Sequence, residues 1–382
     1  MALKVSRRAA AVAPFIVMDV MRVANERRAQ GHDIVHLEVG QPSTPAPQGA
    51  LRAAQAALLG DKLGYVEAFG IPALRQRIAQ HYRTAYGVDL PMERVVVTPG
   101  SSGGFLLSFL AAFDAGDRVA MAAPGYPAYR NILAALGLIP VDLPTTADHN
   151  FQPTVELLQA AGPLDGLILA SPSNPTGTTV SPAELKAVAD YCARNGIRLI
   201  SDEIYHGIVY DGQTATAASL SDSAIVINSF SKYFSMTGWR VGWMVLPPDM
   251  LRATECLSQN MFISTTTISQ HAALAAFECG EELDAHVRRY RANRDLLLDG
   301  LPGAGFDRLT AANGAFYIYA DVGHLTNDSP EFCKRILTEA GVAVTPGLDF
   351  DTTRGNRTLR ISFAGSTEEM AEAVRRLRNW RR

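Results

Sequence analysis

Lys232 lies in a setting where its amine could do chemistry. It occupies a turn rich in hydroxyl groups, within SFSKYFSMTGWRVG at residues 229–242, directly after the apolar run 224–228. That run is rich in β-branched residues and predicts a buried strand, so the turn follows the carboxyl end of a strand. Burial lowers the pKa of a lysine because desolvation disfavours the ammonium. Since a neutral amine condenses with an aldehyde to a Schiff base, Lys232 is a candidate for covalent carbonyl chemistry.

Ser229 and Arg240 flank this lysine and could bind an anion. Arg240 lies between Gly238 and Gly242, and glycines let the backbone approach a bulky group closely. A guanidinium binds a phosphate dianion through two parallel hydrogen bonds. An isolated lysine in a loop is more often a plain surface residue. A lysine for an aldehyde, combined with arginine and serine for a phosphate, nevertheless describes a site for pyridoxal 5′-phosphate (PLP).

The whole stretch resembles the lysine signature of class I and II aminotransferases, which are PLP enzymes of fold type I. Two more runs extend the resemblance, SPSNPTG at 171–177 and DEIY at 202–205. The resemblance implies that Asn174 and Tyr205 donate hydrogen bonds to the phenolate oxygen of the cofactor ring. It also implies that Asp202 pairs with the pyridinium nitrogen, where an anion keeps that nitrogen protonated and the ring electron-accepting.

The position of Asp202 supports this role independently. The residue closes the predicted strand 198–201, and open α/β sheets bind ligands outside the carboxyl ends of their strands. Glu203 is a competing carboxylate at the next position. Alternation along the strand directs its side chain to the opposite face, so we predict that Asp202, and not Glu203, faces the site.

Three further segments complete the expected cofactor site. The run PGSSGG follows a predicted strand and opens a helix, so Gly100, Ser101 and Ser102 can bind an anion at a helix N-terminus. By resemblance, Tyr126 in the run PGYP stacks on the pyridine ring. By the same resemblance, Tyr65 reaches the phosphate of the neighbouring subunit, which implies a homodimer with shared active sites.

The expected substrate contacts lie near the two ends of the chain. Arg360 is flanked by apolar strand residues in TLRISFA, and a buried arginine is costly unless it is paired. By resemblance, Arg360 clamps the substrate α-carboxylate, Gly40 adds a backbone N–H, and Asn174 contacts the same substrate. The chain departs from the family pattern after Gly347, where LDFD replaces a small-x-Phe-Gly run. This departure concerns the shape of the substrate mouth.

Strands and helices alternate over most of the chain. This alternation predicts an α/β fold with a mostly parallel sheet and helices on both faces. Apolar runs predict the strands of that sheet at 94–98, 118–122, 167–170, 198–201, 225–228 and 241–246.

The two ends of the chain follow a different pattern. The N-terminal part predicts a helix near 16–30 and a strand at 34–39, and a long helical region covers 248–301. After it, strands and helices suggest a smaller α+β domain. We expect three parts, namely an N-terminal arm that joins the small domain, a large PLP-binding domain and a small C-terminal domain, at 1–45, 46–280 and 281–382.

Composition argues against several classes of function. The 382 residues are 47% hydrophobic and 19% charged with a net charge of −3 and no block of one sign, so we predict no nucleic-acid or membrane partner. No run of 18 apolar residues occurs, and no membrane span is predicted. The four cysteines are scattered without CxxC spacing, which is typical of a cytoplasmic protein with reduced thiols. We predict no metal site.

The sequence therefore predicts a PLP-dependent transaminase in which Lys232, Asp202 and Tyr205 are catalytic. It would move an amino group between an L-amino acid and a 2-oxo acid by a ping-pong mechanism. No second arginine motif accompanies the arm segment PFIV at 14–17, which favours an apolar or small neutral amino acid. A PLP-dependent β-lyase on the same fold is the nearer alternative, and a non-catalytic PLP-binding regulator is the farther one.

Overall fold

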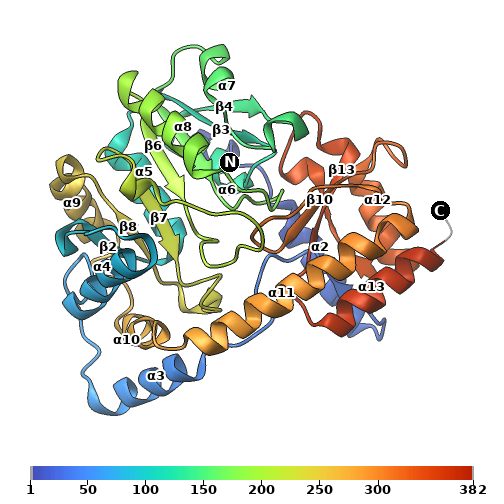
Figure 1. Ribbon diagram of the computed structural model, residues 1–382, viewed down its shortest axis with the longest axis horizontal. Helices are drawn as coiled ribbons and strands as arrows, with labels where there is room; N and C mark the ends of the chain where they lie inside the picture. The colour runs from blue at the N-terminus through green and yellow to red at the C-terminus, as the bar shows by residue number, and fades with distance from the viewer. Residues whose placement is uncertain (1–2, 381–382) are drawn as a thin grey trace.

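A computed structural model describes residues 3–380, which form two lobes around a seven-stranded sheet and a four-stranded sheet. The large lobe is the seven-stranded sheet with the helices that cover it (Figure 1). All neighbouring strands pair in parallel except β8, which is antiparallel to both of its neighbours. In spatial order the strands are β2 (Val95–Thr98), β8 (Gly242–Val245), β7 (Ile225–Ser229), β6 (Arg198–Asp202), β5 (Gly166–Ala170), β3 (Arg118–Ala123) and β4 (Ile139–Pro144).

Both faces of the large sheet are buried because successive strand residues enter two different cores. Val95 and Val97 belong to one apolar cluster, whereas Val96 belongs to another. Near-continuous apolar runs are expected of strands covered by helices on both sides. The helices of this lobe are α3 (Gln48–Gly60), α4 (Pro72–Tyr86), α5 (Gly100–Ala112), α6 (Pro127–Leu136), α7 (Val155–Ala160), α8 (Pro182–Arg194), α9 (Leu251–Met261) and α10 (Thr267–Ala276).

The small lobe contains an antiparallel sheet of four short strands. Their order is β12 (Thr345–Pro346), β13 (Thr358–Ser362), β10 (Tyr317–Asp321) and β9 (Arg308–Leu309). Beside this sheet, β1 (Val35–His36) pairs in parallel with β11 (Val342–Ala343) and so attaches the N-terminal segment to this lobe. The associated helices are α2 (Ile16–Ala29), α12 (Ser329–Arg335) with a following π-helical turn (Ile336–Ala340), and α13 (Thr367–Asn379).

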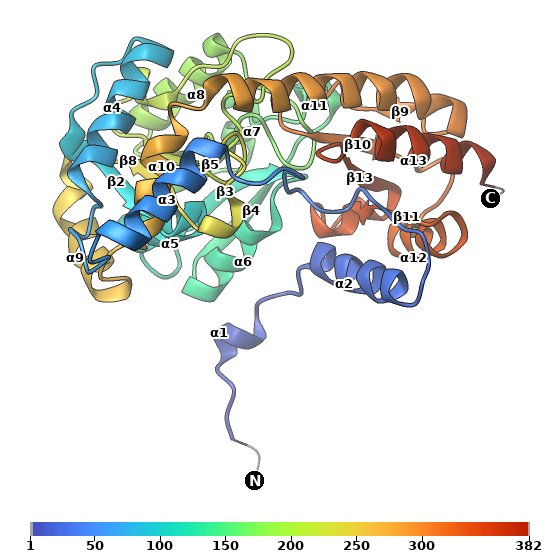
Figure 2. The same cartoon turned by 90° about the horizontal axis from the view of Figure 1, so that it is seen from below.

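Helix α11 (Gly280–Gly300) connects the two lobes along one side of the molecule (Figure 1). Toward the N-terminus, residues 3–6 and α1 (Arg7–Ala10) extend away from the body, and α2 follows beneath the small lobe (Figure 2). No residue of α1 is buried. The segment that precedes α2 therefore gains little stabilisation within this subunit.

The predicted strands of the large sheet are found, and the structure differs from the other predictions in several places. Strand β4 was not predicted, because Pro140 and Pro144 interrupt its apolar pattern; it lies at the edge of the sheet, where proline is tolerated. The strand expected at 34–39 pairs over only two residues. The helical region at 248–301 is divided into α9, α10 and α11.

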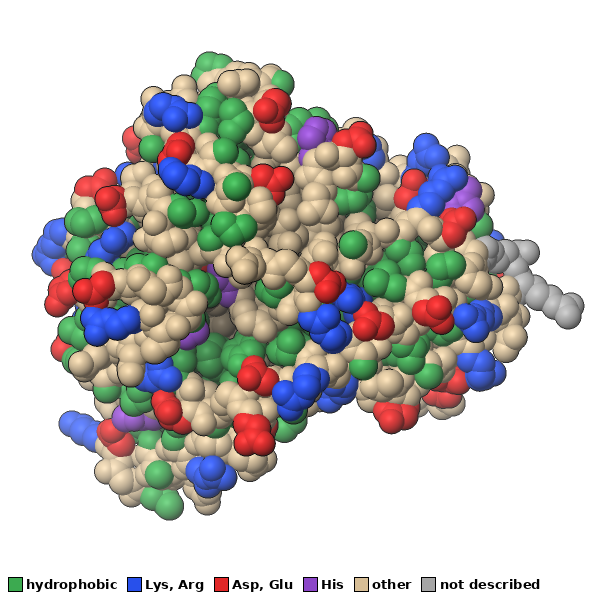
Figure 3. Space-filling model, viewed as in Figure 1, with side chains coloured by type: hydrophobic (Ala, Val, Ile, Leu, Met, Phe, Trp, Pro, Cys, Tyr) green, Lys and Arg blue, Asp and Glu red, His purple; other side chains and the backbone are tan. Residues whose placement is uncertain are grey.

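The surface carries mixed charge. On the face in Figure 3, basic and acidic side chains are interspersed over both lobes, and neither sign forms a large patch on that face. Within residues 3–380, no helix combines the length and the apolar character needed to cross a bilayer.

Candidate active site

A cavity of about 640 Å³ lies between the two lobes, and the first turn of α2 closes one side of its mouth. Its walls come from the segments that follow β2, β3, β5, β6 and β7, together with β10 and β13 of the small lobe. Loops after parallel strands emerge at one edge of a sheet, so they gather side chains that are far apart in sequence. Most of the predicted site residues lie in this cavity, namely Gly40, Ser101, Ser102, Tyr126, Asn174, Asp202, Tyr205, Lys232, Arg240 and Arg360.

Lys232 lies in the turn after β7, with its amine inside the cavity. Its Nζ donates a hydrogen bond of 2.6 Å to the backbone oxygen of Gly40 and lies 5.7 Å from the centre of the Tyr205 ring. Burial, followed by the nearby guanidinium groups of Arg360 and Arg240, lowers the pKa of Lys232 to about 8, and the charge of Asp202 opposes this shift. The predicted neutral amine is therefore accessible near physiological pH.

The N-terminus of α5 and Arg240 form one end of the cavity. Helix α5 has no side-chain cap, so the N–H groups of its first turn remain available, with Ser101 and Ser102 beside them. A Cβ atom on Gly100 would lie 2.4 Å from Nη2 of Arg240, and Gly100 has a φ of +70°. Glycine is thus required here for the guanidinium to approach the helix, and this arrangement could bind an anion.

Ser229 and Ser231 differ in their position relative to the cavity. The Ser229 hydroxyl donates to the Ser231 hydroxyl at 2.9 Å and also lies 3.2 Å from the backbone oxygen of Val241. Ser231 lines the cavity, whereas Ser229 is buried behind it. The sequence pointed to Ser229 alone. The hydroxyl-rich character of the turn was the available signal for Ser231.

Asp202 closes β6 and lies in the cavity, as predicted. One carboxylate oxygen accepts from the backbone N–H of Ile204 at 3.1 Å, and the other accepts from the hydroxyl of Tyr129. Burial raises the pKa of Asp202 to about 6, while these hydrogen bonds and the charge of Lys232 oppose the rise. Tyr129 was not predicted, although it stands three residues after Tyr126, on the same side of the first turn of α6.

Glu203 points away from the cavity, as the alternation of the strand predicted. Its Oε1 accepts from the Ser201 hydroxyl at 3.0 Å and from the backbone N–H of Ala217 at 2.8 Å, whereas its Oε2 has no hydrogen-bond partner. Burial raises the pKa of Glu203 to about 7. The two adjacent carboxylates therefore occupy different environments on opposite faces of one strand.

Aromatic hydroxyl groups and an amide line the middle of the cavity. Tyr205 shares a hydrogen bond of 2.7 Å with Tyr317. Burial, followed by the proximity of Tyr317, raises the pKa of Tyr205 well above its usual value, so its hydroxyl stays protonated and can donate. Tyr126 contacts Phe15 of the N-terminal arm edge-on, with ring centres 5.9 Å apart. The side chain of Asn174 also lines the cavity, and its Oδ1 accepts a hydrogen bond from Arg360.

Arg360, on β13, is buried with its guanidinium in the cavity. Its Nη1 donates to Oδ1 of Asn174 at 2.9 Å, its Nη2 donates to the backbone oxygen of Glu38, and its Nε has no hydrogen-bond partner. The rings of Tyr317 and Phe350 lie 4.5 and 4.8 Å from its central carbon. This buried cation has no carboxylate partner among the described residues, so an anionic ligand would complete its pairing.

Gly40 and Tyr65 lie at different distances from the cavity. Gly40 lines it, and a Cβ atom there would lie 1.9 Å from the Tyr317 hydroxyl, so only glycine allows this approach. Tyr65 does not line the cavity of its own chain, and 84% of it is exposed. The family resemblance implies that Tyr65 reaches the site of a neighbouring subunit, and its side chain makes no hydrogen bond or ring contact among residues 3–380.

The mouth of the cavity is apolar and comes from the N-terminal arm. Phe15, Val17 and Met18 line it from the start of α2. The carboxylate of Asp349, in the segment where the chain departs from the family pattern, accepts hydrogen bonds from the backbone N–H groups of Ile16 and Val17. No local sequence signal predicted this contact, because the partners are more than 330 residues apart.

The chain is similar in sequence and in structure to known aminotransferases. The family model described as "Aminotransferase class I and II" matches residues 32–377. The chain is 52% identical over 376 residues to a valine–pyruvate aminotransferase of Mycobacterium tuberculosis, with 97% of each chain covered. A crystal structure of an aminotransferase from the same organism superposes with a TM-score of 0.98 at 51% identity, covering 99% of each chain. An aspartate aminotransferase from Thermus thermophilus, solved with maleate, gives a TM-score of 0.93 at 32% identity with 99% of each chain covered.

Proposed function

The chain belongs to the class I and II aminotransferase family, and from this premise we propose that it uses PLP to move the amino group of an apolar or small neutral L-amino acid to a 2-oxo acid. The similarity to a valine–pyruvate aminotransferase supports this substrate class. A branched aliphatic amino acid is the donor and pyruvate, or another small 2-oxo acid, is the acceptor. The reaction proceeds as two half-reactions in a ping-pong order.

The polar groups of the cavity fit PLP. The first turn of α5, Ser101 and Arg240 form an anion site for the phosphate, and the Gly100 position leaves room for the guanidinium there. Lys232 supplies an amine for the aldehyde carbon, and Asp202 supplies an anion for the ring nitrogen. The volume of about 640 Å³ lies in the usual range for sites that bind small ligands and cofactors.

The residues of this chain then have distinct roles in the reaction. When bound, PLP supplies an electron sink for the electron pair left at the substrate Cα after its proton departs. Lys232 would take that proton on Nζ and later deliver it to the bound cofactor. A pKa of about 8 suits both the uptake and the release of the proton. Asp202 keeps the ring nitrogen protonated, and Tyr129 orients Asp202 through its hydroxyl. Tyr205 and Asn174 would donate hydrogen bonds to the phenolate oxygen of the bound ring.

Arg360 binds the substrate carboxylate. Its buried guanidinium already lies beside Asn174, and the carboxylate replaces part of the weak pairing that Arg360 makes with backbone and amide oxygens. The substrate is thereby held at its carboxylate while its amine is directed toward Lys232. Fixing both groups converts the reaction into an oriented, effectively intramolecular step.

The proposed substrate class rests on the number of cationic side chains that line the cavity. Among the described residues that line it, only Lys232, Arg240 and Arg360 are cationic, and the chemistry above uses all three. No further cation remains for a second carboxylate on the substrate side chain. The mouth instead presents Phe15, Val17 and Met18, and apolar walls of this kind stabilise an apolar side chain by about 0.8 kcal/mol per buried methylene.

An amino acid panel tests this proposal. Purified enzyme with PLP is given valine, leucine, methionine, alanine, glutamate or aspartate, first without an acceptor and then with pyruvate. We expect the amine form of the cofactor to accumulate with the donor alone and valine to exceed aspartate in kcat/KM. Release of pyruvate or ammonia without the amine form would indicate the lyase alternative, and aspartate as the best donor would overturn the proposed substrate class.

We also propose a cytoplasmic homodimer in which Tyr65 of the partner subunit completes each phosphate site. Leu59, Tyr65 and Ile263 are large apolar side chains that are at least half exposed in the single subunit, and such surface is often buried by association. A C2 dimer supplies the contact reciprocally. The four cysteines are free, as in proteins of reducing compartments.

A further inference from the structure

The first turn of α2 lacks a local cap although it forms a wall of the active site. Phe15 occupies the N-cap position and makes no side-chain cap hydrogen bond. Val17 is buried, whereas Met18 is half exposed at the rim of the cavity. The N–H groups of a first helical turn have no partner within the helix. The placement of this wall therefore depends on groups from elsewhere in the chain.

Asp349 supplies that partner from the small lobe. Its Oδ1 accepts from the Ile16 N–H at 3.0 Å and its Oδ2 accepts from the Val17 N–H at 3.2 Å. Asp349 is 4% exposed, so water competes little for these hydrogen bonds. A carboxylate at the positive end of the helix dipole is also favourable. One side chain thus fixes both the position and the direction of the first turn.

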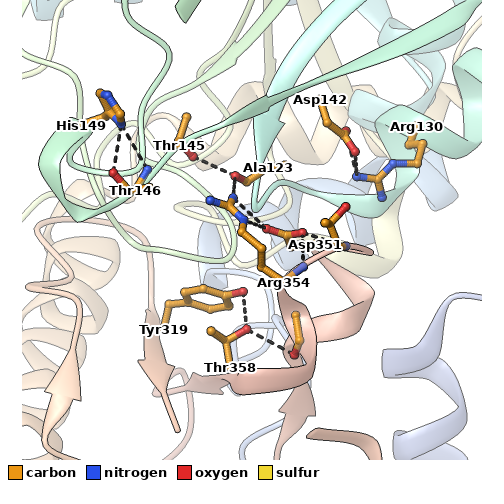
Figure 4. A network of polar contacts seen from close by, with 12 residues as sticks. Ala123, Arg130, Asp142, Thr145, Thr146, His149, Tyr319, Asp351, Arg354 and Thr358 are labelled. Atoms are coloured by element: carbon orange, nitrogen blue, oxygen red, sulfur yellow. Dashed lines mark hydrogen bonds and ion pairs between the residues drawn. The ribbon is translucent and has the colours of Figure 1, made fainter. Parts of the chain in front are cut away.

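The loop that carries Asp349 is itself fastened to the large lobe. The backbone oxygen of Phe350 accepts from the Gly125 N–H at 3.0 Å, next to Tyr126. Arg354 donates to the Ala123 oxygen and is held by Asp351, with an Nε–Oδ2 distance of 2.8 Å (Figure 4). Residues 347–354 therefore connect the arm, the small lobe and the loop after β3.

We propose that Asp349 is a positioning residue for substrate selectivity, because it seats the first turn of α2 so that Phe15, Val17 and Met18 stay against the substrate side chain. This inference rests on the proposed function for the class of substrate. A branched aliphatic side chain gains from such a wall only while the wall excludes water. The hydrogen bonds of Arg360 run to Asn174, Glu38 and Thr345 and not to α2, so a retreat of the first turn weakens side-chain recognition more than the chemistry.

Asp349→Asn is the most direct test. Asparagine keeps the size of the side chain but offers one acceptor, and its amide group faces an N–H instead of accepting from it. In the PLP-loaded enzyme we expect the KM for valine to rise about tenfold with kcat changed less than about threefold, a loss comparable to that of one or two methylene contacts. The KM for alanine should change much less. An unaltered ratio of valine to alanine kcat/KM in a folded variant overturns the proposal.

Ile16→Pro tests the same hydrogen bonds from the helix side. Proline at the first helical position removes the N–H that Asp349 accepts and is otherwise tolerated there. The extended backbone of Phe15, with φ of −94° and ψ of 95°, suits a residue before proline. Ile16→Ala is the matched control, because it shortens the side chain and keeps the N–H. We expect the proline variant to lose valine selectivity and the alanine variant to retain it; equal behaviour of the two overturns the proposal.

Hydrogen–deuterium exchange of the loaded enzyme gives a readout that does not depend on any substrate. Asp349→Asn should speed exchange of the first turn of α2 several-fold, whereas Glu368→Gln, an exposed carboxylate of the small lobe at the start of α13, should leave that turn protected. Unchanged hydrogen–deuterium exchange of this turn in Asp349→Asn overturns the proposal that Asp349 positions it. If the wild-type enzyme fails to prefer apolar donors while this exchange difference is observed, the proposed substrate class fails and the role of Asp349 in seating α2 is retained.

Discussion

The two ends of the active-site cavity are built in different ways. At the inner end, Asp202 closes β6, while Ser101 and Lys232 lie shortly after β2 and β7, so a single local element places each side chain. At the mouth, the first turn of α2 is placed by Asp349, which follows it by more than 330 residues. The inner end carries the chemistry and depends on strand order. The mouth carries selectivity and depends on tertiary contacts among three segments.

This difference predicts that changes at the inner end abolish turnover, while changes at the mouth alter preference. Lys232→Ala is the extreme case, because no other described lysine lines the cavity. We expect turnover to fall by about 10⁴-fold or more, as for other catalytic groups that act as a unit. Borohydride reduction of the wild-type enzyme followed by peptide mapping should label Lys232, and labelling of a different lysine would show the assignment to be wrong.

Asp202→Asn should have the next largest effect. It leaves the anion site of α5 and Arg240 intact, so PLP should still bind, but the ring nitrogen loses its ionic partner. We expect exchange of the substrate Cα hydrogen with deuterated water to slow on the order of 10²-fold or more, since preorganised electrostatic stabilisation is lost. The absorbance of the bound cofactor reports retention separately. Near-normal exchange at Cα would exclude this role for Asp202.

The same difference explains what could be predicted from the sequence. Asn174, Asp202, Lys232 and Arg240 lie in short runs with strong family resemblance, at or near the ends of strands whose apolar patterns are clear. Their convergence in one cavity follows from the geometry of a parallel sheet.

The unpredicted features depend on contacts between distant segments or on irregular patterns. Asp349 resembled an ordinary loop residue because its partners are backbone N–H groups at the other end of the chain. Tyr129 lies on α6, and only the folded structure brings its hydroxyl to Asp202. Strand β4 was not predicted because its two prolines interrupt the alternation of apolar and polar residues by which edge strands are recognised.

Met18→Arg should change preference at the mouth without abolishing turnover. Met18 lines the cavity and is about half exposed, so a longer cationic side chain can extend into the rim. We expect the ratio of glutamate to valine kcat/KM to rise about tenfold, equivalent to roughly 1.4 kcal/mol. Met18→Gln, which adds polarity without charge, is the control. A fall in kcat for every donor would contradict the separation of the mouth from the chemistry.

Tyr65 tests whether the inner end is complete within one subunit. Chains with Lys232→Ala are mixed with chains carrying Tyr65→Phe after reversible dissociation, and hybrid formation is verified by mass. If Tyr65 acts across the interface, one of the two sites in each hybrid has native Lys232 and native partner Tyr65, so activity recovers. If Tyr65 acts in its own chain, neither hybrid site is native. Verified hybrids without recovery would reject the shared site.

Glu203→Gln should leave the chemistry unchanged and affect only stability, since Glu203 is buried on the face of β6 opposite Asp202. Burial raises the pKa of Glu203 from its usual value to about 7, so the folded state binds its proton more tightly than the unfolded state does. Stability from this group is therefore present at low pH and is lost as pH rises from the unfolded pKa, near 4.5, through the folded pKa, about 7. Glutamine does not titrate, and it keeps an acceptor for the Ala217 N–H.

The advantage of Glu203→Gln over the wild type should accordingly grow between pH 5 and pH 8. We expect a Tm gain of about 2 °C at pH 8 and a smaller gain at pH 5, measured by calorimetry on the loaded enzyme. Asp202 titrates in both proteins, so its own contribution cancels in the comparison. An advantage that shrinks with rising pH would contradict the raised pKa, and a large loss of kcat would show that the face of β6 opposite the cavity is not separate from the chemistry.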